Sequence, residues 1–327
     1  MWRFLFLIGL PAAAQSWSPI TSATTANLRG VAANDKAVWV SGDKGTVLKS
    51  LDNGASWRPV SPSGVADLDF RDIEAVDDRT AFLMSSGEGP KSRIYKTTDG
   101  GASWMLLATN LEPKGFWDCM SFWDPTHGII VGDPPVGGDG RFTIMTTLDG
   151  ATWQQIKGPS ANKDEGAFAA SGTCVFTRST PEAWFGTGGL GGARVFHSED
   201  GGQTWSVAKT LIRHDSPSAG IFSLAFSDPQ HGIAVGGDYM KPDESAGTLA
   251  TTADGGKTWS AGKLSGYRSA VWCREFCLVT GTSGSDASFD GGKSWKPVNG
   301  SGFNAIEGGL AVGTNGRMAA LLLPSLR

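Results

Sequence analysis

The sequence predicts an all-β protein built from repeats, and three observations support this class. Glycine and tryptophan are abundant, with 46 and 13 copies among 327 residues, whereas charged residues make up only 18%. This composition favours many short strands joined by glycine turns over helices. A short phrase ending in tryptophan recurs six times, and apolar runs of strand length precede each copy. Together these features indicate a chain of similar β-units.

The repeated phrase, which we call the box, has the form [ST]-x-D-x-G-x-[ST]-W. Complete copies span residues 50–57, 97–104, 198–205, 252–259 and 288–295, and a copy one residue shorter spans residues 147–153. Successive box tryptophans lie 36 to 54 positions apart. Intervals of this size are typical of stacked supersecondary units.

Each unit shows the same strand plan ahead of its box. In residues 222–259 an apolar run ends at the turn Asp228-Pro229, a second ends at Gly236, and a third leads into the box. The same plan fits residues 31–57, 73–104, 120–153, 174–205 and 270–295, and residues 303–324 repeat it in part without a box. Seven units of about four short strands predict a seven-bladed β-propeller. Residues 16–20 resemble the segments after the boxes, so we expect them to add the outer strand of the last blade and to close the ring.

The box residues are those of a tight turn. The aspartate can accept hydrogen bonds from backbone N–H groups two or three residues on, the glycine can take a positive φ, and the tryptophan can bury its ring beneath the turn. We therefore expect a folding device, because a catalytic site is not usually built six times around a ring. The predicted structural residues are Asp52, Asp99, Asp149, Asp200, Asp254, Asp290, Trp57, Trp104, Trp153, Trp205, Trp259 and Trp295.

The first fourteen residues have the pattern of an export signal. Arg3 supplies a positive start, residues 4–10 an apolar core too short to span a bilayer, and residues 12–14 a small-residue cleavage site. We expect residues 1–14 to be removed and residues 15–327 to form a single propeller domain in the periplasm or outside the cell. The alternative is that the apolar run forms a buried first strand.

The four cysteines suit an oxidising compartment. Cys273 and Cys277 flank a tight connection between two strands, where a disulfide across the hairpin neck is geometrically feasible. Cys119 and Cys174 occupy corresponding strands of successive repeats, and their pairing is a second hypothesis. A lone C-x-x-x-C has no second Cys/His pair nearby, so we predict no metal site.

The boxes resemble the Asp-box, or BNR, repeat found in sialidases, sortilin-type receptors and the photosystem II stability/assembly factor family. The blade wording G-I-A-V-G followed by T-T-x-D-G-G-x-T-W at residues 232–259 is most similar to the last of these, which are exported seven-bladed propellers. The resemblance implies a non-catalytic protein that binds a polypeptide partner and takes part in the assembly or repair of a membrane complex, with a lumenal location if the host is photosynthetic. Such relatives also occur in bacteria without photosynthesis.

One position at the start of each inner strand is expected near the mouth of the central channel, where propellers commonly bind partners. It holds Arg29, Arg71, Asp118, Gly172, Phe222, Arg268 and Asn304 in the seven units. The preceding residues in the blades of interest, Leu28, Phe70, Trp117, Tyr267 and Phe303, would form an apolar and aromatic rim. Arginine beside aromatic residues is typical of a carboxylate- or peptide-binding site. We therefore predict a partner surface around Arg29, Arg71, Arg268, Tyr267, Phe70, Trp117, Phe303 and Asn304, of the kind the assembly-factor resemblance also implies. Salt bridges of the arginines inside the channel, with Asp72, Glu74 or Asp118, are the alternative.

Other functions find weaker support in the sequence. A sialidase-like glycoside hydrolase could use Arg29, Arg71 and Arg268 with Tyr267 as nucleophile, but the R-I-P phrase typical of sialidases is missing. Residues 186–191 satisfy G-x-G-x-x-G, yet a strand rather than a helix is expected to follow, so no dinucleotide cofactor is predicted. A net charge of −4 argues against nucleic-acid binding. Long connections at residues 132–141 and 236–247 could wall a ligand or be ordinary surface insertions. We expect a monomer that needs no cofactor.

Overall fold

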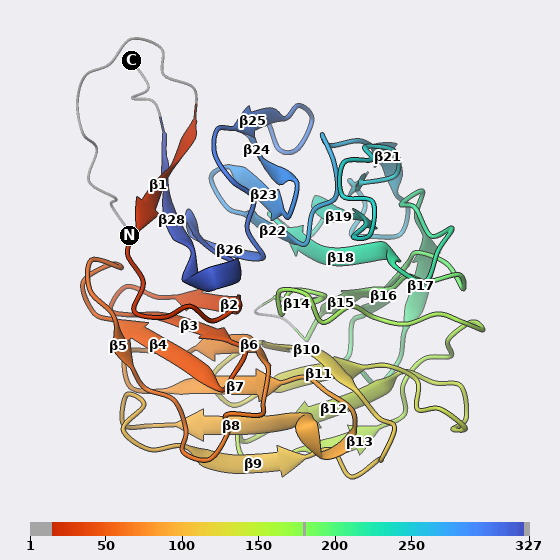
Figure 1. Ribbon diagram of the computed structural model, residues 1–327. Helices are drawn as coiled ribbons and strands as arrows, with labels where there is room; N and C mark the ends of the chain where they lie inside the picture. Colours follow the sequence, from red (N-terminus) through yellow and green to blue (C-terminus); the bar gives the residue numbers. More distant parts are fainter. Residues whose placement is uncertain (1–14, 179–180, 324–327) are drawn as a thin grey trace.

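The computed structural model describes residues 15–178 and 181–323. In these residues it forms seven four-stranded antiparallel sheets arranged in a ring (Figure 1), which confirms the predicted seven-bladed β-propeller. The predicted export signal, residues 1–14, lies outside the described residues. Within the described part, no helix has the length and apolar character needed to cross a membrane.

Each blade starts with an inner strand next to the central channel and ends with an outer strand at the rim (Figure 1). The inner strands are β2 (Leu28–Ala33), β6 (Phe70–Ala75), β10 (Trp117–Phe122), β14 (Val175–Thr177), β18 (Ala219–Phe226), β22 (Ala270–Cys273) and β26 (Ala305–Glu307). The second strands are β3 (Val38–Gly42), β7 (Ala81–Ser85), β11 (Gly128–Gly132), β15 (Ala183–Gly186), β19 (Gly232–Asp238), β23 (Cys277–Gly281) and β27 (Leu310–Val312). We number the blades 1 to 7 from β2 to β26.

The third strands enter the box turns, except in blade 7. They are β4 (Thr46–Ser50), β8 (Arg93–Thr97), β12 (Thr143–Thr147), β16 (Arg194–Ser198), β20 (Leu249–Thr252), β24 (Gly284–Ser288) and β28 (Met318–Leu322). The outer strands are β5 (Arg58–Pro59), β9 (Met105–Thr109), β13 (Gln154–Ile156), β17 (Ser206–Lys209), β21 (Ser260–Gly262), β25 (Lys296–Val298) and β1 (Ser16–Ile20). Two short 3-10 turns, η1 (Gly89–Lys91) and η2 (Thr314–Gly316), complete the described elements.

The ring is closed by the N-terminal strand, as predicted. β1 pairs with β28 from Ser16 opposite Leu322 to Ile20 opposite Met318, so strands from both ends of the chain share blade 7 (Figure 1). Trp17 is buried in this blade, and its indole N–H donates to Ser285 Oγ of blade 6 at 3.0 Å. Closure therefore joins the two ends of the chain through backbone pairing and a shared core.

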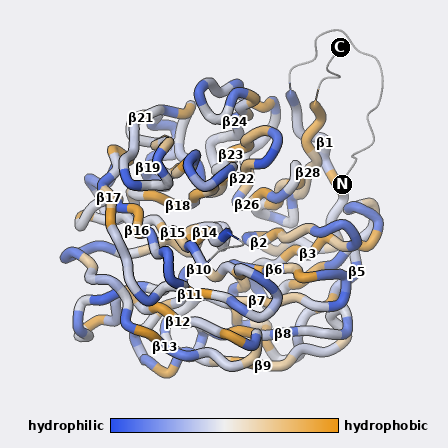
Figure 2. The backbone as a smooth tube through the Cα atoms, turned by 180° about the vertical axis from the view of Figure 1, so that it is seen from behind, coloured by the Kyte–Doolittle hydropathy of each residue, from blue (hydrophilic) through white to orange (hydrophobic). Residues whose placement is uncertain are grey.

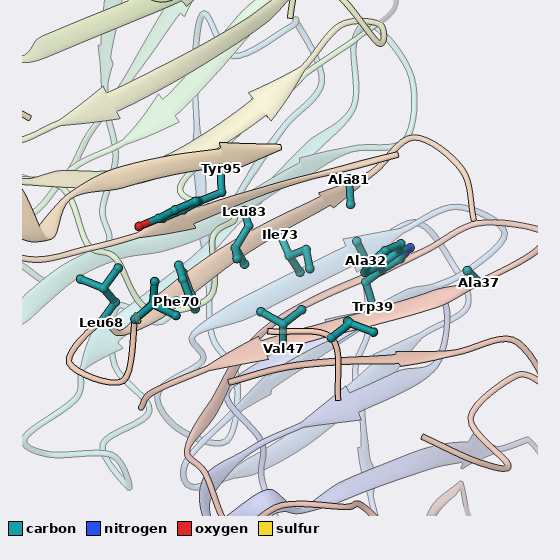
Figure 3. Packing of buried hydrophobic residues seen from close by; sticks show 12 residues of the cluster. Ala32, Ala37, Trp39, Val47, Leu68, Phe70, Ile73, Ala81, Leu83 and Tyr95 are labelled. Atoms are coloured by element: carbon teal, nitrogen blue, oxygen red, sulfur yellow. The ribbon is translucent and has the colours of Figure 1, made fainter. Parts of the chain in front are cut away.

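The core lies between the blades. Both faces of each sheet are covered by neighbouring blades, so the second strands are buried along their whole length rather than at alternate residues, as in β3, β7 and β11. Figure 3 shows one such interface, where Trp39 and Val47 of blade 1 face Ile73 and Leu83 of blade 2. Hydrophobic segments follow the strands and hydrophilic segments the turns (Figure 2).

The box turns have nearly one geometry. In blade 1, Asp52 Oδ1 accepts the backbone N–H of Ser56 at 2.8 Å and Oδ2 accepts the Ser56 hydroxyl at 2.6 Å. Gly54 has a φ of +87°, and its carbonyl accepts the indole N–H of Trp57 at 3.1 Å. The aspartate thus bonds to the residue four positions on. The predicted shorter steps occur in two boxes: Asp149 accepts the backbone N–H groups of Ala151 and Thr152 in the shortened box of blade 3, and Asp290 accepts that of Lys293 in blade 6.

Both pairs of cysteines form disulfides. Cys273 and Cys277 lie opposite each other in the hairpin of β22 and β23, as predicted. Cys119 of β10 bonds to Cys174, just ahead of β14, and so links blades 3 and 4 through a fully buried bond. No free cysteine is present in the described chain.

Candidate functional site

The aligned position at the start of the inner strands is a β-bulge in four blades. The strand register shifts around Arg29, Arg71, Asp118 and Phe222. A bulge leaves one residue unpaired and turns its side chain away from the regular alternation. This end of the channel, which we call the upper mouth, therefore receives side chains that the flat strand pattern would bury between blades.

Arg29 and Arg71 come together at the upper mouth around one carboxylate. Asp69 Oδ2 lies 2.8 Å from Arg71 Nε and 3.5 Å from Arg29 Nε. Burial, followed by the neighbouring Arg71 charge, lowers the pKa of Arg29 from its ordinary value, although an arginine remains charged near neutral pH. Arg29 Nε and Asp69 Oδ1 have no hydrogen-bond partner in the described chain. Two guanidinium groups thus share the Asp69 carboxylate, and the charge of Asp43 also acts on Arg29.

A segment ahead of β14, residues 166–173, lies across the upper mouth, and we call it the bridging segment. Arg71 donates from Nη1 to the carbonyl of Ala169 at 2.9 Å, on the side of blade 2. Ser171 donates to the carbonyl of Ser269, just ahead of β22 in blade 6, at 2.8 Å. Because the segment contacts blades on opposite sides of the ring, it must cross the channel axis. Figure 1 shows β14, which follows it, near the centre of the ring.

An aromatic cluster continues the site from the bridging segment. Phe168 stacks on Phe222 with ring centres 4.0 Å apart, and Phe222 meets Tyr239 and Tyr267 edge-on at 6.1 and 4.8 Å. Tyr239 is 48% exposed and Phe168 half-buried, so these two rings reach the surface. Burial raises the pKa of Tyr267, and the positive charge of Arg29 partly offsets this rise. Tyr267 thus packs against Phe222 and lies within electrostatic range of Arg29.

Arg268 does not join Arg29 and Arg71 at the surface. Its guanidinium is fully buried and donates to Asp286 from Nε at 2.9 Å and to the carbonyl of Tyr267 from Nη1 at 2.8 Å. It lies ahead of β22, and the pairing of β22 with β23 shows no register shift. Asn304 donates to Asn27 Oδ1 and to the carbonyl of Leu28, both at 2.8 Å, and so ties blade 7 to blade 1.

The predicted apolar rim lies in the core instead of on the surface. Phe70, Trp117, Tyr267 and Phe303 are at most 4% exposed. The residue before a bulge stays in the regular strand alternation, and its side chain packs between blades, as Phe70 does against Tyr95. The predicted rim residues therefore do not contribute to the surface of the site. Phe168 and Tyr239 supply the exposed aromatic surface instead.

Sequence reasoning missed Asp69, Phe168 and Tyr239. Asp69 stands two positions before Arg71, but its partner Arg29 belongs to another blade. Phe168 lies in the connection between β13 and β14, which is long for a propeller and could have signalled a special role. Tyr239 lies in the long connection at residues 236–247, for which the sequence left two roles open: a wall beside a ligand or an ordinary surface insertion.

Carboxyl groups beneath the bridging segment support it. Asp133, in the insertion after β11, accepts the backbone N–H of Ala167 at 2.8 Å, and burial raises its pKa to about 6. Asp118 is buried with Oδ2 unpartnered, and burial, then the nearby Asp133 charge, raises its pKa well above the usual value. The alternative arginine salt bridges, with Asp72, Glu74 or Asp118, are not formed in the described chain, where the arginines pair with Asp69 and Asp286.

The geometry of the site offers little support for an enzyme mechanism. Tyr267, the proposed sialidase nucleophile, is 3% exposed, and burial raises its pKa, which favours the unreactive phenol. β15 ends at Gly186 and is followed by strand β16, so no helix begins after the G-x-G-x-x-G phrase. Within the described residues, no group of three or more His, Cys, Asp or Glu side chains is placed to hold a metal ion.

Fold and site together define a seven-bladed β-propeller whose upper mouth carries an arginine pair and exposed aromatic rings. Solved structures share the fold: YCF48 bound to D1 peptide has a TM-score of 0.66 at 15% identity, over 98% of this chain and 99% of that one. YCF48 from Cyanidioschyzon merolae has a TM-score of 0.61 at 16% identity, over 95% and 99%. An ancestral GH74 enzyme has a TM-score of 0.56 at 17% identity, over 91% of this chain and 41% of the enzyme.

Sequence comparison gives a shorter match. A segment of 76 residues, 22% of this chain, is 33% identical to vacuolar protein sorting/targeting protein 10 of Mycosarcoma maydis. The match spans only 5% of that protein. No family model matches the chain. The comparisons therefore establish the fold, which proteins of different function share.

Proposed function

We propose that this protein is a non-catalytic, exported propeller that holds a polypeptide partner at its upper mouth. The observation that carries the proposal is the sharing of Asp69 by Arg29 and Arg71, which leaves guanidinium capacity for a further carboxylate. Guanidinium groups hold carboxylates with paired, charge-assisted hydrogen bonds. Phe168 and Tyr239 add exposed rings of the kind found at peptide-binding hot spots.

Likeness to YCF48 supports this proposal at the level of shape. One YCF48 structure holds a D1 peptide, so a propeller of this architecture can bind a polypeptide. By extension, the partner here would be a subunit of a membrane complex, and the protein would act in its assembly or repair. A monomer suffices for this role, because the arginine pair and the aromatic rings come from one chain.

Peptide titration tests the proposal. We expect a labelled peptide that ends in phenylalanine with a free carboxylate to bind saturably, and its C-terminal amide to bind roughly tenfold more weakly, because a charge-assisted hydrogen bond contributes about 1.5–3 kcal/mol. Arg29→Ala and Arg71→Ala should each cause a similar loss, measured by fluorescence anisotropy.

Arg79→Ala is the matched control, since Arg79 is exposed in the turn between β6 and β7, at the opposite end of the blade. It should leave the affinity unchanged. Equal binding by the wild type and both mouth variants would refute the proposal. The alternative, a sialidase-like glycoside hydrolase, requires release of sialic acid from a chromogenic substrate that is lost in Tyr267→Phe; the burial of Tyr267 argues against this activity.

A further inference from the structure

The junction of blades 3 and 4 carries two hollows away from the upper mouth. One of about 420 Å³ lies between residues 157–160 and strands β16 and β17. The other, of about 550 Å³, lies between the box of blade 3 and that of blade 4. Gln203, exposed at the tip of the blade 4 box, lines both hollows. The hollows therefore meet at this side chain, and we call them together the junction groove.

One end of the junction groove is basic. Lys157 is exposed and forms no ion pair with any carboxylate in the described chain, and Arg141 lies beside it with Asp139 at 3.5 Å. Arg194 also lines this end, but Glu165 neutralises its charge. The half-exposed ring of Trp205 and the exposed Val207 give this end an apolar wall.

The other end is acidic. Asp124, Asp149 and Asp200 line it, and hydrogen bonds from their own turns hold the pKa of each below the usual range, so all three are charged at neutral pH. His127 pairs with Asp124 at 2.8 Å. Leu148, 76% exposed, supplies an apolar contact from the one box that is a residue shorter than the others. This end of the groove is therefore negative with an apolar side.

The two ends are close enough for one short peptide. Gln154 lines the acidic end and Lys157 the basic end, three positions apart along β13 and the residue that follows it. In an extended strand this separation is about 10 Å, the length of three residues. An occupant thus meets opposite charges within a few residues, with apolar side chains at each end.

We propose that the junction groove binds an extended peptide segment of a partner protein, with an acidic side chain toward Lys157 and Arg141 and a basic side chain toward the three aspartates. Charge complementarity selects this occupant, because an uncharged glycan or a lipid tail offers no pair of opposite charges at this spacing. Strand β13 is the outermost strand of blade 3, and no strand of the described residues pairs with its outer edge, where a chain can add. The proposal is independent of the arginine pair at the upper mouth.

The probe is a fluorescein-labelled octapeptide with two aspartates at one end, a leucine-alanine-alanine-leucine centre and two lysines at the other. We expect saturable binding to the full chain that weakens with rising salt. Lys157→Glu should weaken it at least tenfold, and Asp124→Asn about fivefold, because asparagine keeps the turn but loses the charge. An octapeptide with lysines at both ends should instead bind Lys157→Glu more tightly than it binds the wild type.

Lys296→Glu is the matched control, because it makes the same charge change on β25, the exposed outer strand of blade 6. It should bind the first octapeptide as the wild type does. Thermal unfolding of each variant shows that the fold is kept. Equal affinity for Lys157→Glu and Lys296→Glu, or equal binding of a neutral octapeptide with the same apolar centre, would overturn the proposal.

Discussion

At the scale of single residues, two neighbouring positions of one inner strand have different roles. Arg71 sits on a bulge and reaches the upper mouth, whereas its neighbour Phe70 stays in the regular alternation and is buried. Gly172 occupies the equivalent position in blade 4 but belongs to the bridging segment. Its φ is +76°, and a Cβ there would come within 2.6 Å of the Asp72 carboxyl.

Gly172→Ala tests how tightly the bridging segment fits. The substitution combines an unfavourable backbone conformation with a clash against Asp72, so we expect a loss of roughly 2–4 kcal/mol in the free energy of unfolding, measured with urea. Gly137→Ala is the control: its φ is +82°, but no atom lies within 4 Å of the added Cβ. It should cost only about 1 kcal/mol. Equal losses would show that the segment is not packed against Asp72.

At the scale of strands and turns, the two disulfides have different mechanical roles. Cys119–Cys174 closes a loop of 55 residues between blades, whereas Cys273–Cys277 spans four residues within one hairpin. In the chain-entropy account, a longer closed loop removes more freedom from the unfolded chain. The inter-blade bond should therefore stabilise the ring more.

Paired substitutions measure this difference. Cys119→Ala with Cys174→Ala should lower the free energy of unfolding by about 4 kcal/mol, and Cys273→Ala with Cys277→Ala by about 2 kcal/mol. Urea unfolding of the two double variants under oxidising conditions gives the values. The reverse order of stability would show that native packing, rather than loop entropy, determines their contributions.

At the scale of the whole molecule, the ring depends on blade 7, where the two ends of the chain meet. Trp17 is 8% exposed and packs edge-on against Phe303 with ring centres 5.1 Å apart. Its indole N–H donates a hydrogen bond to Ser285 of blade 6. Trp17→Ala should lower the free energy of unfolding by about 3–5 kcal/mol, because a large cavity opens at the closing blade. Leu51→Ala, at a residue 58% exposed, should change it by less than about 0.5 kcal/mol. Thermal and urea unfolding compare the two.

Ionisation also acts on the whole ring. Burial raises the pKa of Asp133 to about 6 and of Glu307 to about 7, so the folded protein holds protons that the unfolded chain releases near pH 4. Stability should therefore fall as pH rises from about 4 to about 7 and then level off. Below pH 4 the sign reverses, because hydrogen bonds from Ser56 and Ser103 hold the pKa of Asp52 and Asp99 at about 2, and their contribution is lost as they become protonated.

Urea unfolding at pH 5 and pH 8 checks this dependence. We expect the free energy of unfolding to be lower at pH 8 by roughly 1–3 kcal/mol, allowing for partial exposure of both carboxyl groups. Asp133→Asn should reduce the difference, since the amide oxygen still accepts the Ala167 N–H but carries no charge. A wild type more stable at pH 8 than at pH 5 would contradict the argument.

The repeated boxes, the strand plan and the segment at residues 16–20, which resembles the segments after the boxes but has no box of its own, determined the propeller and its closure. These are local signals, because a turn is specified by the few residues that form it and a repeat is recognised from its spacing along the sequence. The Cys273–Cys277 pairing could likewise be foreseen, because its hairpin is local. The candidate site could be predicted only in part, through the position of Arg29 and Arg71.

Only the tertiary structure decided which of the aligned residues reach the upper mouth. A bulge depends on how two strands pair. The residue pattern of a single strand predicts neither the burial of Arg268 against Asp286 nor the sharing of Asp69 by two blades. Phe168 entered the site because a connection between blades crosses the channel. Turns and strands depend on neighbours in sequence, whereas this site depends on contacts between residues far apart in the chain.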